Sequence, residues 1–315
     1  MLSGVSITSA AQHGTLNMRN RFLALLITMA VPAMPLFSQG QQGQGQTLGS
    51  PAAAQAQPQS PQNQRPVLPT PRGPDGRVNL GPLEGQAGVW APAGIVQLAV
   101  NPGSVNRANA STHLPNSINI KDVPFQPWAR ALHAARGANI EADDPHTRCK
   151  ISGGARQFIT PYGVEFLDMP ELKRMFIVDI GGPHTYRIIY MDGRFHPANL
   201  APTSYGHSIG RWDGDTLVVD TVGFTEKFWI DREGTPHTEQ LHLTERFTRT
   251  DFSTLKYEIT VDDPGAYTAP WTGGFLLRWG AGTELFEYVC QDNNRSPEAM
   301  IGSDQSGSRP ARTVP

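Results

Sequence analysis

The segment GHSIGRWDGDTLVVDTVGF, residues 206–224, decides the fold of this chain. Strand-like runs with aromatic and β-branched residues lie on both sides of Asp213-Gly214, which is typical of two antiparallel strands joined by a two-residue type I′ turn. Asp192-Gly193 lies between strand-like runs in the same way. Consecutive hairpins without intervening helices indicate an antiparallel meander, so we predict an all-β domain.

Short segments rich in aromatic and β-branched residues extend this pattern along the chain. About nine strands of this kind suit a barrel or two packed sheets. We expect a mainly antiparallel, lipocalin-like β-barrel in preference to a two-sheet sandwich. The candidate strands are 164–169, 174–179, 186–191, 206–212, 215–224, 240–248, 255–262, 275–279 and 284–290.

The segment before these strands has a different pattern. Residues 78–122 are rich in Gly, Pro, Asn and Ser, which predicts an irregular wrap around the domain. A single short helix is expected at 127–137, because proline is tolerated in a first turn and apolar residues recur with helical spacing. The expected apolar stripe comprises Trp128, Ala131, Leu132 and Ala135.

The N-terminus has the three parts of a secretory signal peptide. Residues 18–21 are a short basic segment, 22–37 form an apolar run, and Ser38 follows. The run is shorter than the roughly 20 residues that a spanning helix needs, and it contains two prolines. We therefore expect a cleaved signal at 1–38, with Met18 as an alternative start, no integral membrane span, and a periplasmic or secreted protein.

Composition divides the rest of the chain. Residues 39–73 contain Gln, Gly, Pro, Ala and Ser with almost no large apolar side chain, so a disordered linker is expected there. The tail at 296–315 has a similar composition. Between them, 74–295 is long enough for one β-rich domain.

The charge and the motifs of the chain exclude some functions. A formal net charge of −2, without a cluster of Lys and Arg, argues against a nucleic-acid partner. Neither a Gly-rich phosphate loop nor a G-x-S-x-G nucleophile elbow is present. We expect no cofactor and a small-molecule ligand or substrate; the sequence leaves the oligomeric state open.

Cys149 and Cys290 lie near opposite ends of the expected domain. An even number of cysteines in an exported chain favours a disulfide. A pair of buried free thiols or a nucleophilic cysteine is the alternative.

The register of the hairpin at 206–224 places His207 opposite Asp220 if Asp213-Gly214 is the turn. The same face would carry Arg211. A carboxylate beside an imidazole fixes its tautomer and raises its basicity, which suits a general base. A cross-strand polar pair on a solvated face is the alternative interpretation.

Two further groups are candidates for a site. His237 and His242, with carboxylates nearby, are weak candidates for metal ligands, since no tight His-x-His pair fixes their spacing. Separate, hydrogen-bonded histidines are the alternative. Arginines and aromatic residues that point into a barrel would orient an acidic or phenolic ligand. These candidates are Arg187, Tyr190, Trp229, Arg246 and Tyr267.

Several sequence motifs, taken in their order along the chain, carry a resemblance to a known family. They are DDPHTRC (143–149), IIYMDGRFHP (188–197), GHSIGRWDGDTLVVDTVGF (206–224), PHTEQLHLTERF (236–247), DDPGAYTAPW (262–271) and EYVCQDNN (287–294). The chain resembles, on these phrases, a family of exported bacterial proteins of unassigned function. The resemblance implies that both cysteines belong to the family pattern, which supports a bridge between them. It implies no activity, ligand or catalytic residue.

Two functions remain on the sequence alone. The first is a cofactor-independent acid–base enzyme of lyase, isomerase or hydrolase type acting on a small, partly apolar molecule. His207 would be its base and Asp220 would orient the base, while Arg211 or Arg187 would stabilise negative charge. The second is a lipocalin-like carrier of an apolar ligand, and a metal-dependent form of the enzyme is a third possibility. A polar hairpin face inside a cavity would favour catalysis, and the same face outside would favour carriage.

Overall fold

The computed structural model describes residues 67–92, 94, 96–103, 112–160, 162–179, 185–286 and 290. The expected signal peptide, most of the expected linker and the expected tail lie outside these residues. The end of the expected linker, 67–73, hydrogen-bonds to the domain: the Phe252 amide donates to the Leu68 carbonyl at 3.0 Å, and the Thr70 hydroxyl donates to the Arg249 carbonyl at 3.1 Å. No helix in the described part is long and apolar enough to cross a membrane.

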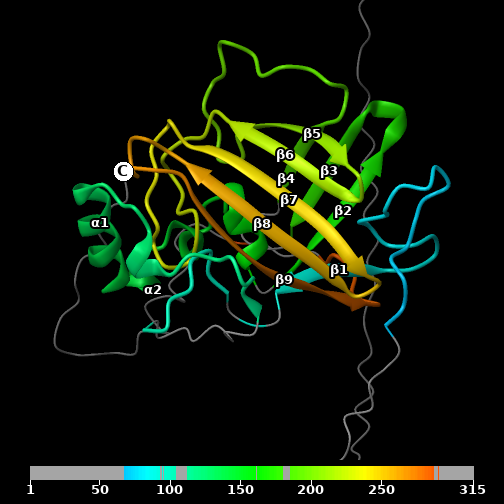
Figure 1. The fold of residues 1–315 in the computed structure, drawn as a ribbon, viewed down its shortest axis with the longest axis horizontal. Coiled ribbons are helices and arrows are strands. Elements are labelled where there is room, and N and C mark those ends of the chain that lie inside the picture. Colours follow the sequence, from blue (N-terminus) through cyan, green and yellow to red (C-terminus); the bar gives the residue numbers. More distant parts are fainter. Residues whose placement is uncertain are drawn as a thin grey trace, which may run out of the picture. The chain divides into compact units, whose positions relative to one another are not determined.

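A closed β-barrel forms the described domain, as Figure 1 shows. Neighbouring strands in the sequence are neighbours in the barrel, and β1 pairs with β9 to close it. The expectation of an all-β barrel is therefore confirmed. The strands are β1 (Gly88–Pro92), β2 (Val164–Met169), β3 (Arg174–Asp179), β4 (Tyr186–Tyr190), β5 (His207–Asp213), β6 (Thr216–Val222), β7 (His242–Asp251), β8 (Thr254–Asp262) and β9 (Trp271–Ala281).

The first strand was not predicted from the sequence. Residues 88–92 were expected in the irregular wrap, but Trp90 is fully buried and pairs with Val164 of β2 and Trp279 of β9. This strand closes the barrel, because it pairs with β2 on one side and with β9 on the other, and those two strands are far apart in the sequence. The predicted strand at 284–290 is absent from its described residues, 284–286 and 290.

One pair of neighbouring strands is parallel. Ile189 of β4 pairs with Ser208 of β5 in parallel, whereas every other pair of neighbouring strands is antiparallel. A parallel pair cannot be joined by a two-residue turn. The predicted hairpin at Asp192-Gly193 is therefore wrong, and these residues begin a long crossover at 191–206 that returns along the outside of the barrel (Figure 1).

The hairpin between β5 and β6 has a register that differs from the prediction. Gly214 and Asp215 are the two turn residues, because Asp213 pairs with Thr216. Gly214 takes the first central position with φ of +58°, which favours glycine. Each β5 residue therefore pairs two positions further along β6 than expected. A slip of two keeps every side chain on its predicted face.

Side chains and a short helix fill the interior of the barrel. All residues of η4 (Gly154–Ile159) are buried, and Phe158 stacks against aromatic rings of the strands at centroid distances of 4.8–6.3 Å. The inward-facing residues of β6 and β7 are almost without solvent exposure. A lipocalin-type ligand cavity would have to occupy this same space.

The two ends of the barrel are covered differently. One end of the barrel is covered by α1 (Pro127–Gly137). The chain around Phe125, just before this helix, hydrogen-bonds to the connection between β8 and β9. The buried face of α1 contains Ala129, whereas Trp128 is 45% exposed, so the predicted apolar stripe is displaced by one residue. At the other end, the segment 67–82 crosses the barrel. The remaining helical turns are η2 (Ile120–Asp122), α2 (Ile140–Asp143), η3 (Pro145–Arg148) and η5 (Pro170–Leu172).

Candidate functional site

Three histidines and an aspartate form a hydrogen-bonded network on the outer face of the barrel. His207 Nδ1 lies 2.8 Å from His196 Nδ1. His196 Nε2 lies 2.8 Å from Asp220 Oδ1, and His242 Nε2 lies 2.7 Å from Asp220 Oδ2. We call these four residues the histidine–aspartate network.

Strand alternation places three members of the network on the outer face. Their sequence neighbours Ser208 and Thr221 point inward and are fully buried. Successive side chains of a strand alternate between the two faces, so His207 and Asp220 point outward. His242 begins β7, whose residue Thr244 pairs with Asp220. The polar face of the hairpin therefore points away from the interior of the barrel.

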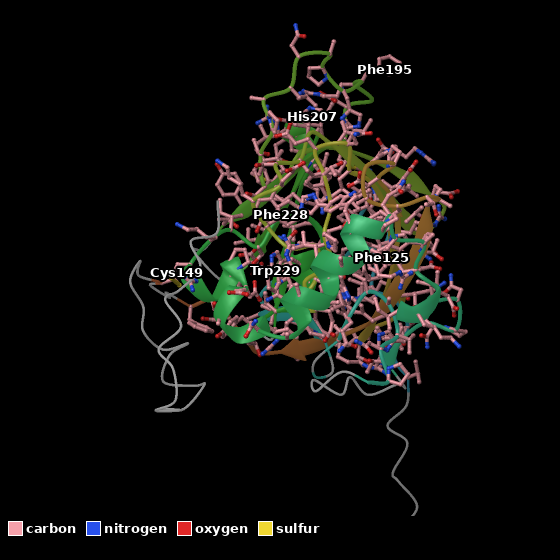
Figure 2. All side chains as sticks on the ribbon, turned by 90° about the vertical axis from the view of Figure 1, so that its left-hand side faces the viewer. Phe125, Cys149, Phe195, His207, Phe228 and Trp229 are labelled. Atoms are coloured by element: carbon pink, nitrogen blue, oxygen red, sulfur yellow. A yellow bond between two sulfur atoms is a disulfide. The ribbon has the colours of Figure 1, made fainter. Side chains whose placement is uncertain are left out.

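The crossover at 191–206 supplies the fourth member. Because β4 and β5 are parallel, the chain has to return along the outside of the barrel before β5 begins. This path places His196 between His207 and Asp220. Figure 2 shows His207 beneath the loop that carries Phe195, and Phe195 is 91% exposed.

The predicted pair of His207 and Asp220 is thus joined through His196. Asp220 lies opposite Ile209, and His207 lies opposite Val222, so the two are diagonal neighbours in the sheet. The sequence correctly predicts that both residues share a face, but it does not predict the imidazole between them or the second imidazole, His242, on the same carboxylate.

The hydrogen bonds of the network determine the tautomers of two histidines. An ionised carboxylate only accepts hydrogen bonds, so His196 carries its proton on Nε2 and donates to Asp220. The Nδ1 atom of neutral His196 is then an acceptor, and His207 Nδ1 donates to it. Neutral His207 therefore has an unprotonated Nε2, to which no described residue hydrogen-bonds.

Charges and burial hold His207 in its neutral form. Partial burial lowers the pKa of His207, and positive charge on Arg194, or on His196 when that ring is protonated, lowers it further, while Asp192 acts in the opposite direction. Burial alone would raise the pKa of Asp220, but the hydrogen bonds from His242 and His196 outweigh this effect and lower it. At neutral pH the network thus contains an anionic carboxylate and an unprotonated base.

Tyr190 and Arg194 flank His207. The ring of Tyr190 stacks on His207 at a centroid distance of 5.0 Å and an interplanar angle of 21°. The Arg194 guanidinium lies 3.9 Å from the centre of the Tyr190 ring and pairs with Asp192 at 2.6 Å. The site therefore offers one aromatic surface and one cation beside the imidazole.

Arg187 does not belong to this site. It lies in the interior of the barrel, where its guanidinium bonds to the Glu245 carboxylate and to the hydroxyls of Ser208 and Thr221 at 2.9 and 2.7 Å. Burial alone would lower the pKa of Arg187, but the Glu245 carboxylate outweighs it and raises the pKa. The prediction that Arg187 stabilises charge beside His207 is wrong, because the wall of the barrel separates the two side chains. Arg211 does share the outer face and is exposed.

The predicted ligand-binding residues do not converge. Tyr190 contacts His207, whereas Arg246 pairs with Asp213 at 3.0 Å near the opposite end of the hairpin. Trp229 and Tyr267 are buried near α1, where the Trp229 ring lies 5.0 Å from the Arg136 guanidinium. Figure 2 places Trp229 well away from His207.

The two weak candidates for metal ligands lie in different places. His237 is buried, with its ring nitrogens 3.0 Å from the Phe228 carbonyl and 3.2 Å from the Thr238 carbonyl. His242 belongs to the histidine–aspartate network. Across the described ranges, no group of three or more His, Cys, Asp or Glu residues has the arrangement of a metal site. Two atoms that each bind one metal ion at about 2.0–2.1 Å lie further from each other than the hydrogen-bonded atoms of the network do.

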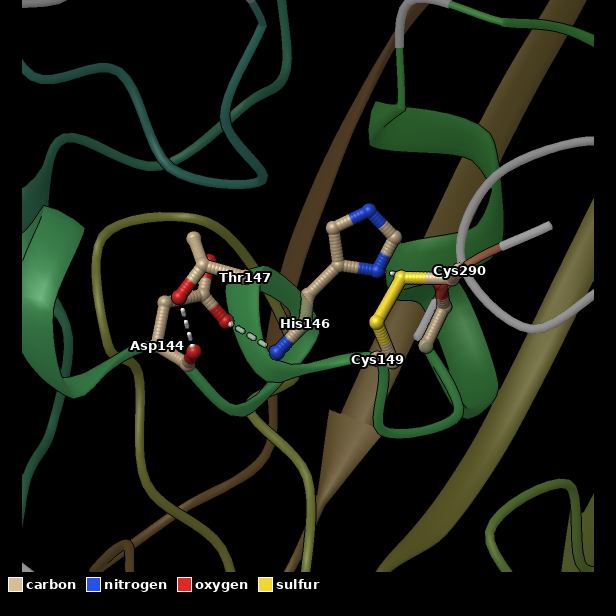
Figure 3. The surroundings of a disulfide bond; sticks show 6 residues. Asp144, His146, Thr147, Cys149 and Cys290 are labelled. Carbon is tan, nitrogen blue, oxygen red and sulfur yellow. Dashed lines mark hydrogen bonds between the residues drawn. A yellow bond between two sulfur atoms is a disulfide. The ribbon is translucent and has the colours of Figure 1, made fainter. Parts of the chain in front are cut away.

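The disulfide between Cys149 and Cys290 is present, as predicted. It joins residues 141 positions apart, with a Cα–Cα distance of 5.5 Å. Cys149 follows η3, which Asp144 begins by accepting a hydrogen bond from the His146 amide (Figure 3). The same turn directs His146 Nδ1 to the Ser152 hydroxyl at 3.0 Å.

Comparison of the chain with models of known protein families, with curated proteins and with solved structures finds no match. The resemblance noted on the sequence phrases remains a prediction. The function has to be inferred from the site itself.

Proposed function

We propose that this protein is a cofactor-independent acid–base enzyme whose general base is Nε2 of His207. The observation that supports this most is the chain of hydrogen bonds from Asp220 through His196 to His207. It leaves one ring nitrogen of His207 unprotonated and without a described partner. A base within reach of a substrate proton, oriented by a second group, is the arrangement that general-base catalysis requires.

In this proposal His196 and Asp220 are positioning residues. When His207 takes a proton, its charge is stabilised through the hydrogen bond to His196 and by the carboxylate beyond it. His242 shares this carboxylate and holds it in place from the other side. Neither Asp220 nor His242 has to touch the substrate.

The substrate would approach from outside the barrel. Tyr190 and the exposed Phe195 provide apolar surface for a small, partly apolar molecule. Arg194 takes the role that the sequence predicts for Arg211 or Arg187, since its guanidinium, paired with Asp192, lies beside Tyr190 and acts electrostatically on His207. Positive charge near a base stabilises an anion that forms when a proton is removed. The polar face of the hairpin lies outside, which on the sequence argument favours the alternative, carriage of an apolar ligand inside the barrel. Carriage nevertheless has less support than catalysis, because η4 and strand side chains occupy the interior that such a ligand would need.

The proposal is tested with 5-nitrobenzisoxazole, a small aromatic molecule that reports on general bases. Loss of its C3 proton to the base breaks the N–O bond and releases a coloured phenolate. We expect His207→Ala to lower kcat/KM at pH 7.5 by about tenfold or more, the lower end of typical general-base effects. Thr216→Ala is the matched control, because Thr216 lies on the same outer face at the far end of the hairpin.

An equal rate in His207→Ala and in the control variant would overturn the proposal. Circular dichroism and thermal unfolding of both variants show whether the barrel is intact. The interpretation requires that the melting temperatures of the two variants agree within a few degrees.

A further inference from the structure

A second candidate site lies at the end of the barrel opposite α1. Residues 73–82 cross this end and, with β2 and β3, line an open pocket of about 800 Å³. This volume lies in the range of about 300–1,000 Å³ that is usual for small-molecule sites. The pocket is separate from the histidine–aspartate network, and none of its lining residues belongs to that network.

Apolar side chains form the floor of the pocket. Val78 and Leu80 contribute from the crossing segment, and Phe166 and Met175 contribute from β2 and β3; each is at most 4% exposed. Met169 and Pro82 extend the same surface. The floor therefore favours an apolar ligand body, because an apolar lining offers no hydrogen-bond partner to a polar group placed against it.

Specific contacts hold the crossing segment in place. The Arg249 guanidinium donates to the carbonyls of Asn79 and Gly81 at 2.6 and 3.3 Å, and it lies 4.9 and 5.2 Å from the rings of Trp90 and Trp279. A Cβ on Gly81 would lie 2.4 Å from the Phe166 carbonyl oxygen, so glycine permits this close approach. The pocket is thus formed before any ligand binds, which lowers the entropic cost of binding.

One carboxylate at the rim has no partner of its own. Asp168 pairs with Met175 across β2 and β3, so its side chain lies on the same side of the sheet as the floor. No described residue hydrogen-bonds to the Asp168 carboxylate. In contrast, the other two charged residues of the lining, Asp75 and Arg77, pair with each other at 2.5 Å. This pairing leaves Asp168 as the net charge of the lining.

The surroundings of Asp168 also favour a cation. Burial raises the pKa of Asp168, and the carboxylates of Asp75 and Glu171 add to this effect, while Arg77 opposes it. Each of these carboxylates would be stabilised by a positive charge placed at the rim.

We propose that this pocket binds a small molecule with an apolar body and one protonated amine. The amine contacts Asp168 at the rim, and the apolar body covers Val78, Leu80, Phe166 and Met175 on the floor. This binding site goes beyond the proposed acid–base function and does not depend on it.

The full chain is titrated with three probes of equal chain length: n-octylammonium, 1-octanol and octanoate. Binding is measured by isothermal titration calorimetry at pH 7.5. We expect n-octylammonium to bind about fivefold or more tightly than 1-octanol and octanoate to bind most weakly, as a partly exposed ion pair permits. Asp168 is the one charged residue of the lining without an ion-pair partner among the described residues, so we expect a stoichiometry of one.

Asp168→Asn removes the charge and keeps the shape of the side chain. We expect it to weaken n-octylammonium binding by about five- to tenfold and to leave 1-octanol binding unchanged. Glu165→Gln is the matched control, since Glu165 lies on the same strand but outside the lining of the pocket. His207→Ala should bind all three probes as the natural chain does, which separates this proposal from the proposed function.

Three results would overturn the proposal. Equal affinity for n-octylammonium and octanoate would show that the rim does not select charge. An equal effect of Asp168→Asn and Glu165→Gln would place the binding elsewhere. Absence of saturable binding by all three probes would show that the pocket is not a ligand site in the full chain.

Discussion

His196 and His207 face each other through the same ring atom, with Nδ1 of one 2.8 Å from Nδ1 of the other. Only one of the two atoms carries the shared proton when both rings are neutral. Asp220 decides which, because its carboxylate accepts a hydrogen bond from Nε2–H of His196 and so leaves His196 Nδ1 as the acceptor. This order of donors and acceptors leaves Nε2 of neutral His207 without a proton.

His196 and Asp220 should act as one unit. We expect His196→Ala and Asp220→Asn each to lower kcat/KM for 5-nitrobenzisoxazole, because each removes a link between the carboxylate and His207. The double variant should be no slower than the slower single variant, since residues of one network are not additive. Effects that multiply in the double variant would show that the two residues act separately.

The buried pair of Arg187 and Glu245 should govern stability and not the reaction. Both side chains are at most 1% exposed, and the Tyr257 hydroxyl also donates to Glu245 at 2.9 Å. Removing one partner leaves an uncompensated buried charge, so Glu245→Gln should lower the free energy of unfolding by about 3–5 kcal/mol. Urea unfolding measures this change. The double variant Arg187→Met/Glu245→Leu should lose less than the single variant, and a larger loss in the double variant would contradict this account.

His146 should make the domain sensitive to acid. Burial lowers the pKa of His146 from 6.5 to about 4, with Arg156 and Arg232 adding to the effect and Asp144 opposing it. The unfolded chain therefore takes up this proton first as the pH falls, and stability is lost between pH 6.5 and about 4. The full loss from this group is about 3 kcal/mol.

The acid sensitivity is measured by urea unfolding at pH 7 and at pH 4 for the natural chain and for His146→Gln. Other groups titrate in the same range, so the informative quantity is the difference between the two proteins. We expect the variant to lose less stability on acidification. An equal loss in both would mean that His146 is protonated as readily in the folded protein as in the unfolded chain.

The disulfide should contribute a large part of the stability of the domain. Closing a loop between residues 141 positions apart stabilises by about 5 kcal/mol on the chain-entropy model. We expect Cys149→Ser/Cys290→Ser to lower the free energy of unfolding by about 4–5 kcal/mol in urea unfolding. A reducing agent should have the same effect on the natural chain and none on the variant. Unchanged stability after complete reduction, verified by thiol titration, would contradict this prediction.

The elements that follow from local patterns were predicted well. The bounds of β2 and β3 agree with the prediction, because both segments are short and rich in apolar residues and a short turn separates them. The faces of the hairpin were also correct, even though Gly214 moved the turn by one position. Alternation within a strand depends only on neighbouring residues and survives a register slip of two.

The elements that depend on distant partners were missed. β1 is a strand because it bridges β2 and β9, and the parallel pairing of β4 with β5 depends on the crossover that brings His196 to Asp220. The interior position of Arg187 depends on Glu245 from β7. A histidine three residues after Asp192-Gly193 gave no local signal of its partners. Such contacts become visible only when the order of the strands is known.

The most direct test of the account is a long-range ¹H–¹⁵N NMR titration of the histidine rings between pH 5 and pH 8.5. The account predicts that neutral His207 is protonated on Nδ1 and neutral His196 on Nε2. It also predicts that His207 Nε2 takes up its proton with a midpoint below the ordinary pKa of 6.5. A neutral His207 protonated on Nε2, or a midpoint above 6.5, would contradict the account, because His207 would then not present an unprotonated nitrogen to a substrate at neutral pH.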